Sequence, residues 1–324
     1  MTNRERFLKT MRHEKTDRVP YFEEGIRKDV IKAWRAQGLT KKAELSEMFS
    51  ADRREEIEVD LEPLPRPKKW PASGNGLNLM RKRLDPDDSR RLPRKWSRQV
   101  RTWRSRDYLL MLRVHRGFFL SMGVYGWDRF SEVIRLLIKD PKFVQEAMAV
   151  QGEFAARMAE KILNEVEIDA AVFSEPIGGN DRPLISPKMY EEFVLTSYQP
   201  VLDVLNRYGV ETIILRTFAN TRILIPSILK RGFNCLWACE VNIDAMDYRD
   251  LRREFGPELR LIGGIDLDAL RRDKESIRRE VEEKVPPLLT GGGYIPLADG
   301  RIRADVPFEN YVYYRKLLDK VTRV

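Results

Sequence analysis

From about residue 140 to the end of the chain, the apolar positions switch repeatedly between two periods. Helical spacing predicts helices over 140–166, 185–209, 223–232, 244–256, 273–289 and 307–321. Short, continuously apolar runs predict buried strands over 168–176, 210–216, 233–240, 259–266 and 292–299. This alternation of strand and helix is typical of parallel βαβ units with right-handed crossovers.

The first 110 residues are less regular. Apolar spacing predicts a strand over 17–25, a helix over 26–38 and a strand over 109–114. Residues 62–80 are rich in proline, glycine and asparagine, and we expect a long loop there.

Two α/β architectures have this rhythm, an open doubly wound sheet and a closed barrel. No G-x-G-x-x-G phosphate loop follows an early strand, which disfavours a dinucleotide-binding sheet. The 324 residues accommodate a barrel of about 250 residues. We therefore predict a (β/α)8 TIM barrel that occupies residues 1–324 as a single domain, with an irregular N-terminal extension.

Positive charge is concentrated in one segment. The net charge is +9, and residues 81–106 contain eleven lysines and arginines against three aspartates. We expect a twisted basic hairpin whose long side chains cover Trp96 and Trp103. The alternatives are a nucleic-acid surface and a docking surface for an acidic partner. Because no known nucleic-acid motif accompanies the charge, nucleic acid is not the expected partner.

Cysteine content and hydropathy indicate the compartment. No run of about 18 apolar residues exists, so we expect no membrane-spanning segment. Two cysteines, Cys235 and Cys239, are too few for a disulfide framework, which favours the reducing cytoplasm. Zinc needs three or four ligands, so we interpret both thiols as small core residues.

In a βα barrel the active site lies at the carboxyl ends of the strands, and polar side chains follow most of the predicted strands. The candidates for acid or base chemistry are His115, Glu175, Asp266 and Asp299. The expected substrate-binding residues are Glu23, Arg27, Asn180, Asp181, Arg216, Phe218, Asn220, Glu240 and Arg301.

Several candidates also have a purely structural interpretation, which stays open. Glu23 suits the start of a helix, where a carboxylate favours the helix dipole. His115 suits a half-buried position with its hydrogen bonds satisfied, and Asp299 suits an Asx turn. His13 is interpreted as a surface residue.

Four segments resemble the uroporphyrinogen decarboxylase superfamily, which includes the haem-pathway decarboxylase and corrinoid- or folate-dependent methyltransferases. They are "NRERFLKTMRHEKTDRVPYFE", "LISPKMYEEF", "FNCLWACEVNIDAMDYRDLRREFGPELRLIGGID" and "GGYIPLADGRIRADVPFENYVYYRKLL". The resemblance covers nearly the whole chain and is weakest over 62–110. It implies a (β/α)8 barrel with a pocket at its carboxyl face.

The chain departs from that superfamily at places that carry chemistry. The decarboxylase pattern has an arginine pair soon after the first strand, where Arg27 stands alone here. The histidine of its G-H-G step corresponds to Asp299 in "LADGRI". Zinc-dependent methyltransferases carry His-x-Cys after one strand, where "RTFAN" has Arg216 and Phe218.

These departures favour some reactions over others. Without the ligands that turn a thiol into a thiolate, we expect no zinc. An arginine binds a carboxylate or phosphate bidentately and a phenylalanine offers its face to a flat ring, so "RTFAN" is interpreted as a socket for an anionic planar molecule. Tetrapyrroles, corrinoids and folates all fit that description.

We therefore expect zinc-independent methyl transfer, with a corrinoid or tetrahydrofolate as co-substrate and no tightly bound cofactor. Decarboxylation of a porphyrinogen-like acid, catalysed by a lyase, is the alternative. A barrel that binds a ligand or protein partner without catalysis is the third hypothesis. The expected partners are an anionic small molecule and, for methyl transfer, a corrinoid protein. The chain is expected to be a monomer or a homodimer.

Overall fold

The computed structural model describes residues 1–40, 45–179, 181–239 and 246–323. Close contacts divide the chain into two compact α/β units. Unit 1 comprises Met1–Arg54, Asp107–Leu109 and Cys235–Val324, and unit 2 comprises Glu55–Arg106 and Leu110–Asn234. Each unit is built around parallel strands that follow one another in chain order.

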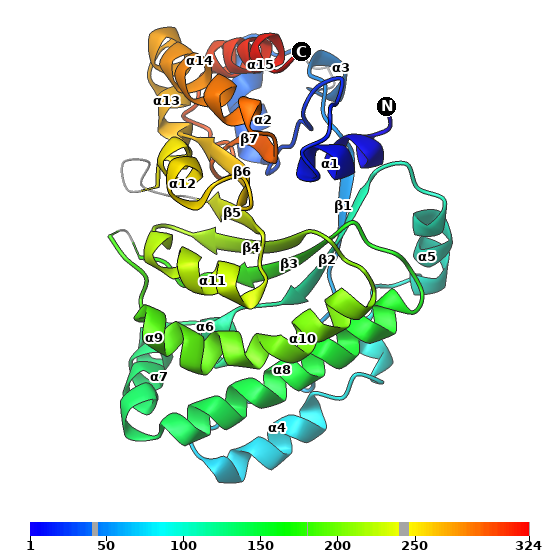
Figure 1. The fold of residues 1–324 in the computed structure, drawn as a ribbon, viewed down its shortest axis with the longest axis vertical. Coiled ribbons are helices and arrows are strands. Elements are labelled where there is room, and N and C mark those ends of the chain that lie inside the picture. The colour runs from blue at the N-terminus through cyan, green and yellow to red at the C-terminus, as the bar shows by residue number, and fades with distance from the viewer. Residues whose placement is uncertain (41–44, 180, 240–245, 324) are drawn as a thin grey trace. The chain divides into compact units, whose positions relative to one another are not determined.

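Unit 2 contains the strands β2 (Leu109–His115), β3 (Ala170–Glu175) and β4 (Ile213–Phe218), paired in parallel and in that order (Figure 1). β1 (Arg54–Ile57) lies where the two units divide. The pairing of β2 with β3 shifts register between Arg113 and His115, which is a β-bulge. Such bulges re-aim side chains near functional sites.

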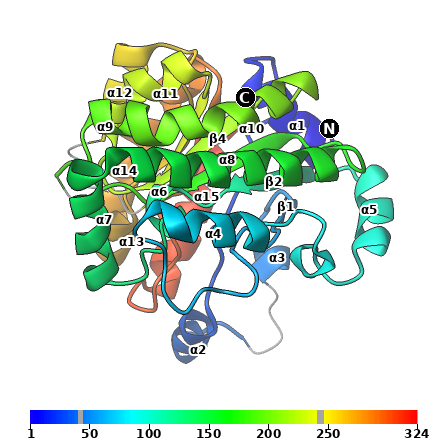
Figure 2. The same ribbon diagram turned by 90° about the horizontal axis from the view of Figure 1, so that it is seen from below.

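Helices cover the strands of unit 2. The helices α8 (Pro141–Leu163) and α10 (Thr196–Arg207) pack side by side in both views (Figures 1 and 2). A short helix, α9 (Pro187–Met189), leads through a π-helical turn, Tyr190–Leu195, into α10. The remaining helices are α4 (Leu77–Arg83), α5 (Trp96–Arg104), α6 (Phe118–Ser121), α7 (Trp127–Lys139), α11 (Ile225–Arg231) and the 3-10 turns Gly74–Gly76, Ser89–Arg91 and Arg222–Leu224.

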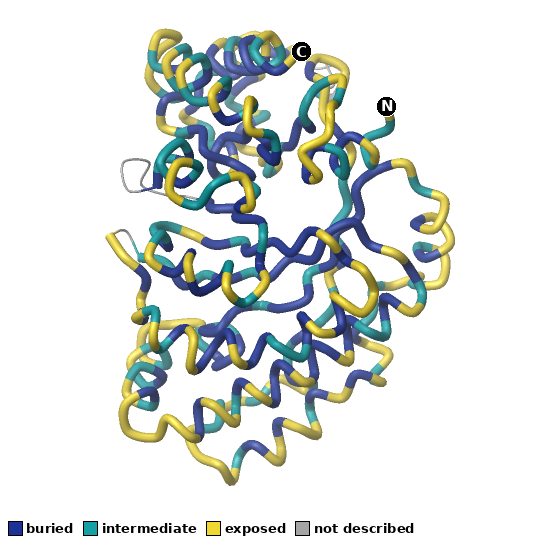
Figure 3. Tube along the Cα trace, in the orientation of Figure 1, coloured by how far each residue is buried: buried dark blue, intermediate teal, exposed yellow. Residues whose placement is uncertain are grey.

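Unit 1 contains the parallel strands β5 (Cys235–Cys239), β6 (Arg260–Ile265) and β7 (Tyr294–Ala298). All residues of β5 and β7 are buried, as expected for strands covered on both faces (Figure 3). The helices are α1 (Asn3–Met11), α2 (Lys28–Ala36), α3 (Leu45–Met48), α12 (Tyr248–Phe255), α13 (Leu267–Arg271), α14 (Lys274–Thr290) and α15 (Phe308–Thr322).

The structure confirms every helix and strand predicted from residue 140 onward, with boundaries shifted by a few residues. The predicted strand over 17–25 is wrong, because among the described residues this segment makes an isolated bridge at Arg18 and no strand. The closed eightfold barrel is not confirmed, since the described residues form seven strands. The single-domain assignment stays a prediction. No helix in the described part of the chain has the length and hydropathy needed to cross a membrane.

The expected basic hairpin over 81–106 is also wrong, because this segment forms α4, a 3-10 turn and α5. Its centre is Arg91, which is only 1% exposed. The Arg91 guanidinium donates to four backbone carbonyls, those of Asp60, Glu62, Arg83 and Asp85. Arg91, which the sequence suggests is a surface residue, therefore stabilises this irregular segment from the protein interior.

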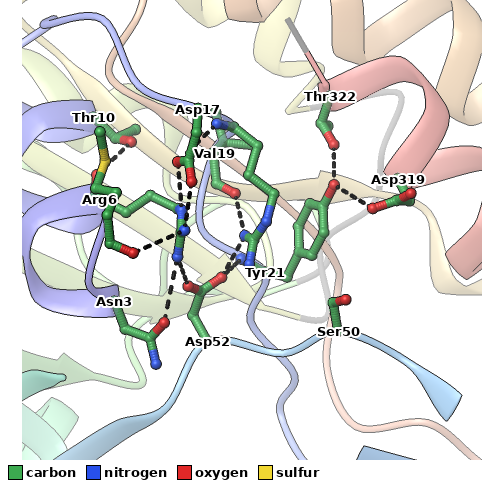
Figure 4. Close-up of polar contacts among 12 residues, drawn as sticks. Asn3, Arg6, Thr10, Asp17, Val19, Tyr21, Ser50, Asp52, Asp319 and Thr322 are labelled. Carbon is green, nitrogen blue, oxygen red and sulfur yellow. Dashed lines mark hydrogen bonds and ion pairs between the residues drawn. The ribbon is translucent and has the colours of Figure 1, made fainter. Parts of the chain in front are cut away.

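A buried carboxylate organises the N-terminal part of unit 1 (Figure 4). Asp52 forms ion pairs with Arg6 and with Arg18, the second at 2.6 Å, and accepts a hydrogen bond from the Tyr21 amide at 2.7 Å. Arg6 also binds Asp17 at 2.8 Å. The Tyr21 hydroxyl hydrogen bonds with Thr322, so the network reaches α15. These contacts, rather than a strand, fix the path of residues 17–22.

We predict that Asp52→Asn lowers the free energy of unfolding by about 3–5 kcal/mol, because Arg6 and Arg18 each lose an ion pair with a buried carboxylate, and of the two pairs of Arg6 the one with Asp17 remains. Urea unfolding followed by circular dichroism measures the change. Asp87→Asn is the matched control, since the Asp87 side chain is 77% exposed and forms a surface ion pair with Lys161. There we expect a change below about 1 kcal/mol. Equal losses in the two variants would contradict the assigned role of Asp52.

Candidate functional site

The β2–β3–β4 sheet of unit 2 presents different side chains on its two faces. Ser174 pairs with Arg216, and Glu175 pairs with Thr217. Side chains alternate along a strand, so Ser174 and Arg216 share one face with Arg113, whose partner Val172 lies two residues before Ser174. These three residues are half-buried, whereas Glu175 and Thr217 are completely buried against the helices.

On the half-buried face, one carboxylate binds two arginines. Glu56, in β1, accepts two hydrogen bonds from Arg216 at 2.7 and 2.9 Å and one from Arg113 at 2.9 Å. Arg113 also pairs with Glu58. Burial disfavours the charge on Glu56, but the hydrogen bond and charge of Arg216, helped by Arg113, outweigh burial and lower its pKa. Glu56 therefore stays an ionised carboxylate.

Arg216 lies on the half-buried face, and the carboxylate that it binds bidentately is the chain's own Glu56. Phe218, at the end of the same strand, is 37% exposed, so its ring is accessible. Glu56 and Arg113 were missed from the sequence, because β1 lies in the irregular region and Arg113 stands inside a strand. A glutamate two residues before another, in "REEIEV", was the available signal.

Behind the other face, Glu175 forms the centre of a buried polar cluster. Its Oε1 accepts a hydrogen bond from the Phe118 amide at 2.9 Å, and its Oε2 accepts one from the Tyr198 hydroxyl. Burial raises the pKa of Glu175 to about 7, against the effect of both hydrogen bonds. Through these two hydrogen bonds, Glu175 links the helix α10 to the turn that connects β2 with α6. It contacts other protein groups on both oxygens, which favours a positioning role.

His115 belongs to the same cluster. Its Nδ1 accepts a hydrogen bond from the Gly117 amide at 3.0 Å, so in the neutral ring the proton is on Nε2. Nε2 is buried and has no hydrogen-bond partner among the described residues. The ring lies 4.4 Å from that of Tyr198, centroid to centroid. Burial, with the nearby charge of Arg116, lowers the pKa of His115 to about 3.

Gly117 makes this close packing possible. Its φ is +86°, and a Cβ there would come within 2.5 Å of the Ser174 carbonyl oxygen and 2.8 Å of Glu175 Oε1. Any other residue would clash with the end of β3. The structure therefore brings His115 and Glu175 together, as their strand-end positions suggested, but away from the half-buried face.

Two further substrate-binding candidates stabilise a loop. The Asn220 side chain donates to the Asp181 carbonyl at 2.9 Å and accepts from the Arg222 amide at 3.0 Å. Asp181 itself is exposed. Asn220 therefore closes the loop after β3 onto the end of β4. Asn180 and Glu240 lie outside the described residues.

In unit 1, Asp299 follows β7 and is 6% exposed. Its Oδ1 accepts a hydrogen bond from the Gly264 amide at 3.1 Å, while its Oδ2 has no hydrogen-bond partner among the residues described. Burial raises its pKa well above the usual value, and Asp266 and Glu280 add to the shift. The raised pKa favours the protonated form of Asp299, and a protonated carboxyl group with one oxygen unused is a suitable proton donor.

The other unit 1 candidates have structural partners or lie in solvent. Asp266 is the N-cap of α13 and accepts from the Asp268 amide at 2.8 Å. Glu23 forms an ion pair with Arg315. Burial raises the pKa of Glu23, although the charge of Arg315 opposes the shift. Arg27 and Arg301 are exposed, and His13 is exposed as predicted.

The residues near the end of β4 and in β5 do not fit a zinc–thiolate site. Arg216 and Phe218 offer no metal-binding atom. Cys235 and Cys239 are both buried in β5, and burial raises the pKa of the Cys235 thiol to about 12. Within the described residues, no three histidine, cysteine or acidic side chains are grouped as metal ligands. Burial supports the interpretation of both cysteines as core residues.

The buried cluster predicts a pH dependence of stability in which two groups oppose each other. Between about pH 3 and 6.5 the unfolded chain binds a proton at His115 that the folded chain rejects, so stability rises with pH. Between about pH 4.5 and 7 the folded chain holds a proton at Glu175 that the unfolded chain releases, so stability falls with pH. We predict that Glu175→Gln removes only the second effect.

The unfolding free energy of Glu175→Gln should then rise relative to the wild type by about 3 kcal/mol between pH 4.5 and 7. Urea unfolding at a series of pH values measures the difference. Glu146→Gln, at an exposed position of α8, is the matched control. A difference between Glu175→Gln and wild type that stays constant over this range would contradict the prediction.

Comparison with known families agrees with the resemblance seen in the sequence. The family model described as Uroporphyrinogen decarboxylase (URO-D) matches residues 120–319, more than half of the chain. This range includes β3 to β7 and the residues from Glu175 to Asp299. No curated protein matches the chain. The chain therefore belongs to the uroporphyrinogen decarboxylase (URO-D) family.

Proposed function

We propose that this chain is an enzyme of the URO-D family that binds an anionic, planar ring compound and transfers a methyl group without zinc. The observation that carries the proposal is the Glu56–Arg216–Arg113 group on the half-buried face of the β2–β3–β4 sheet. An ionised carboxylate accepts hydrogen bonds from ring N–H groups, and guanidinium groups bind ring carboxylates. Phe218 offers an accessible face for stacking.

Tetrapyrroles, corrinoids and folates all combine a flat ring with acidic or amide side groups. Methyl transfer between a folate nitrogen and a corrinoid cobalt needs no thiolate activated by zinc, which fits the side chains at the end of β4. The corrinoid or tetrahydrofolate acts as co-substrate and supplies or accepts the methyl group. In this proposal, Glu56, Arg113, Arg216 and Phe218 of unit 2 hold the ring.

In unit 1, taken by itself, Asp299 is the candidate for acid chemistry. Its raised pKa favours the protonated form, and its second oxygen has no hydrogen-bond partner among the described residues, which suits a proton donor. The same property favours the second candidate function, decarboxylation of a porphyrinogen-like acid. In that reaction an acid protonates the pyrrole ring before carbon dioxide leaves, and arginines bind the remaining carboxylates.

We predict that the purified protein binds cobalamin or a reduced folate in the micromolar range. Arg216→Ala should weaken this binding by about 1.5–3 kcal/mol, as for the loss of a hydrogen bond to a charged group. Titration followed by absorbance or calorimetry measures the dissociation constant. Arg207→Ala is the matched control, because the Arg207 side chain is 60% exposed on α10.

An unchanged dissociation constant in Arg216→Ala would remove this residue from the binding site. Binding of a porphyrin alone, with no affinity for cobalamin or folate, would overturn methyl transfer in favour of decarboxylation. Binding with no turnover of either kind would favour a carrier.

We predict that Asp299→Asn lowers turnover by about 10²–10⁴-fold, the usual contribution of a general acid, and leaves ligand affinity unchanged. Turnover is measured as methylcobalamin formation from methyltetrahydrofolate, and separately as carbon dioxide release from a porphyrinogen acid. Asp268→Asn, at an exposed carboxylate on α13, is the control. Full activity of Asp299→Asn in the reaction that the wild type catalyses would refute the role of Asp299 as the acid.

A further inference from the structure

The helix α5 carries a cationic surface that the proposed function does not use. Arg94, Lys95, Arg98 and Arg101 are all exposed, and no ion pair to any of them is present in the described part of the chain. Other cations of the same segment have local partners: Arg81 pairs with Glu153, Arg90 with Asp88 and Arg106 with Asp169. The four residues form one patch, which we call the α5 patch.

The opposite side of α5 is fixed to the rest of unit 2. Val100 and Trp103 are buried, and the Trp103 indole donates to Glu55 at 2.7 Å. The Trp96 indole donates to Glu165 at 2.9 Å, and the two indole rings pack edge to face, 5.4 Å apart. Arg98 and Arg101 therefore sit on a helix that is fixed along its other side, and Arg94 and Lys95 directly precede it, so the backbone of the helix needs no ordering when a partner binds.

The same contacts decide which class of macromolecule fits. Single-stranded nucleic acids bind through bases that stack on exposed aromatic rings, but both tryptophans point inward and are hydrogen bonded. A helix at a membrane surface inserts its apolar face, and the apolar face of α5 is occupied by the protein. Neither nucleobases nor lipid chains find a contact here.

The size of the patch argues against duplex nucleic acid. Tight duplex binding neutralises about 6–10 phosphates, more than four cations provide. Within α5, Arg98 and Arg101 are three residues apart, which is the spacing of neighbouring side chains on one face of a helix.

We propose that the α5 patch is a docking surface for an acidic protein, and that it receives a helix with carboxylates three and four residues apart. Charge complementarity of this kind increases the association rate and fixes the register of two surfaces. This inference stands independently of the reaction that the chain catalyses.

The test uses the full chain and a fluorescently labelled helical peptide with glutamates repeated at three- and four-residue spacing. We expect binding by fluorescence anisotropy that weakens between about 50 and 200 mM salt. The double variant Arg98→Glu/Arg101→Glu should lose roughly tenfold or more in affinity, because two attractive contacts become repulsive. The control Lys139→Glu/Lys142→Glu changes the net charge equally at exposed positions outside α5 and should bind as the wild type does.

A peptide with the same composition but scrambled spacing, a short DNA duplex and vesicles with equal phosphatidylcholine and phosphatidylserine complete the comparison. Tighter binding of the duplex or of the vesicles, lost in the α5 variant, would replace the acidic protein by nucleic acid or membrane. Equal losses in both double variants would show that net charge alone acts, and would overturn the proposal. Absence of peptide binding at low salt would overturn it as well.

Discussion

In a parallel sheet, paired residues on neighbouring strands point to the same face, and this constraint decides what β2, β3 and β4 offer to a ligand. The register that pairs Ser174 with Arg216 also pairs Glu175 with Thr217, so neighbouring positions of one strand go to opposite sides. The side of Arg216 is half-buried and receives Glu56. The side of Glu175 is sealed by α10. A shift of β4 by one residue would move Arg216 from the side of Glu56 to the side of Glu175, where any ion pair would be completely buried.

The sequence contains enough information for most of the elements, because their apolar periods are long and uninterrupted. The predictions from sequence fail where polar contacts, rather than the periodicity of apolar residues, fix the path of the chain. Residues 17–22 look like a strand because Tyr21 and Phe22 are apolar, yet Asp52 and its arginines fix their path. The basic segment resembles a solvated hairpin, but Arg91 is turned inward onto backbone carbonyls that no pattern of residue types reveals.

The candidate site could be predicted in part for a related reason. The carboxyl ends of strands identify candidate positions, and His115, Glu175, Arg216 and Asp299 were predicted from them. The face on which each side chain lies, and the residue that it contacts, depend on the strand register, on the bulge after Arg113 and on the residue opposite. Glu56 lies far from Arg216 in the sequence, and only the fold reveals that an arginine expected to bind a ligand already has a carboxylate. Any anionic ligand must therefore share Arg216 with Glu56 or compete for it.

The π-helical turn Tyr190–Leu195 has a consequence for how the chain tolerates changes in length. In an uninterrupted α-helix, residues eight apart differ by about 80° around the axis. The wider turn, marked by the bond from the Thr196 amide to the Glu191 carbonyl five residues back, allows Tyr190 and Tyr198 both to be fully buried beside Glu175. Deletion of one residue there would restore regular winding and rotate one tyrosine out of the interior, so this helix is constrained in its residue count as much as in its residue types.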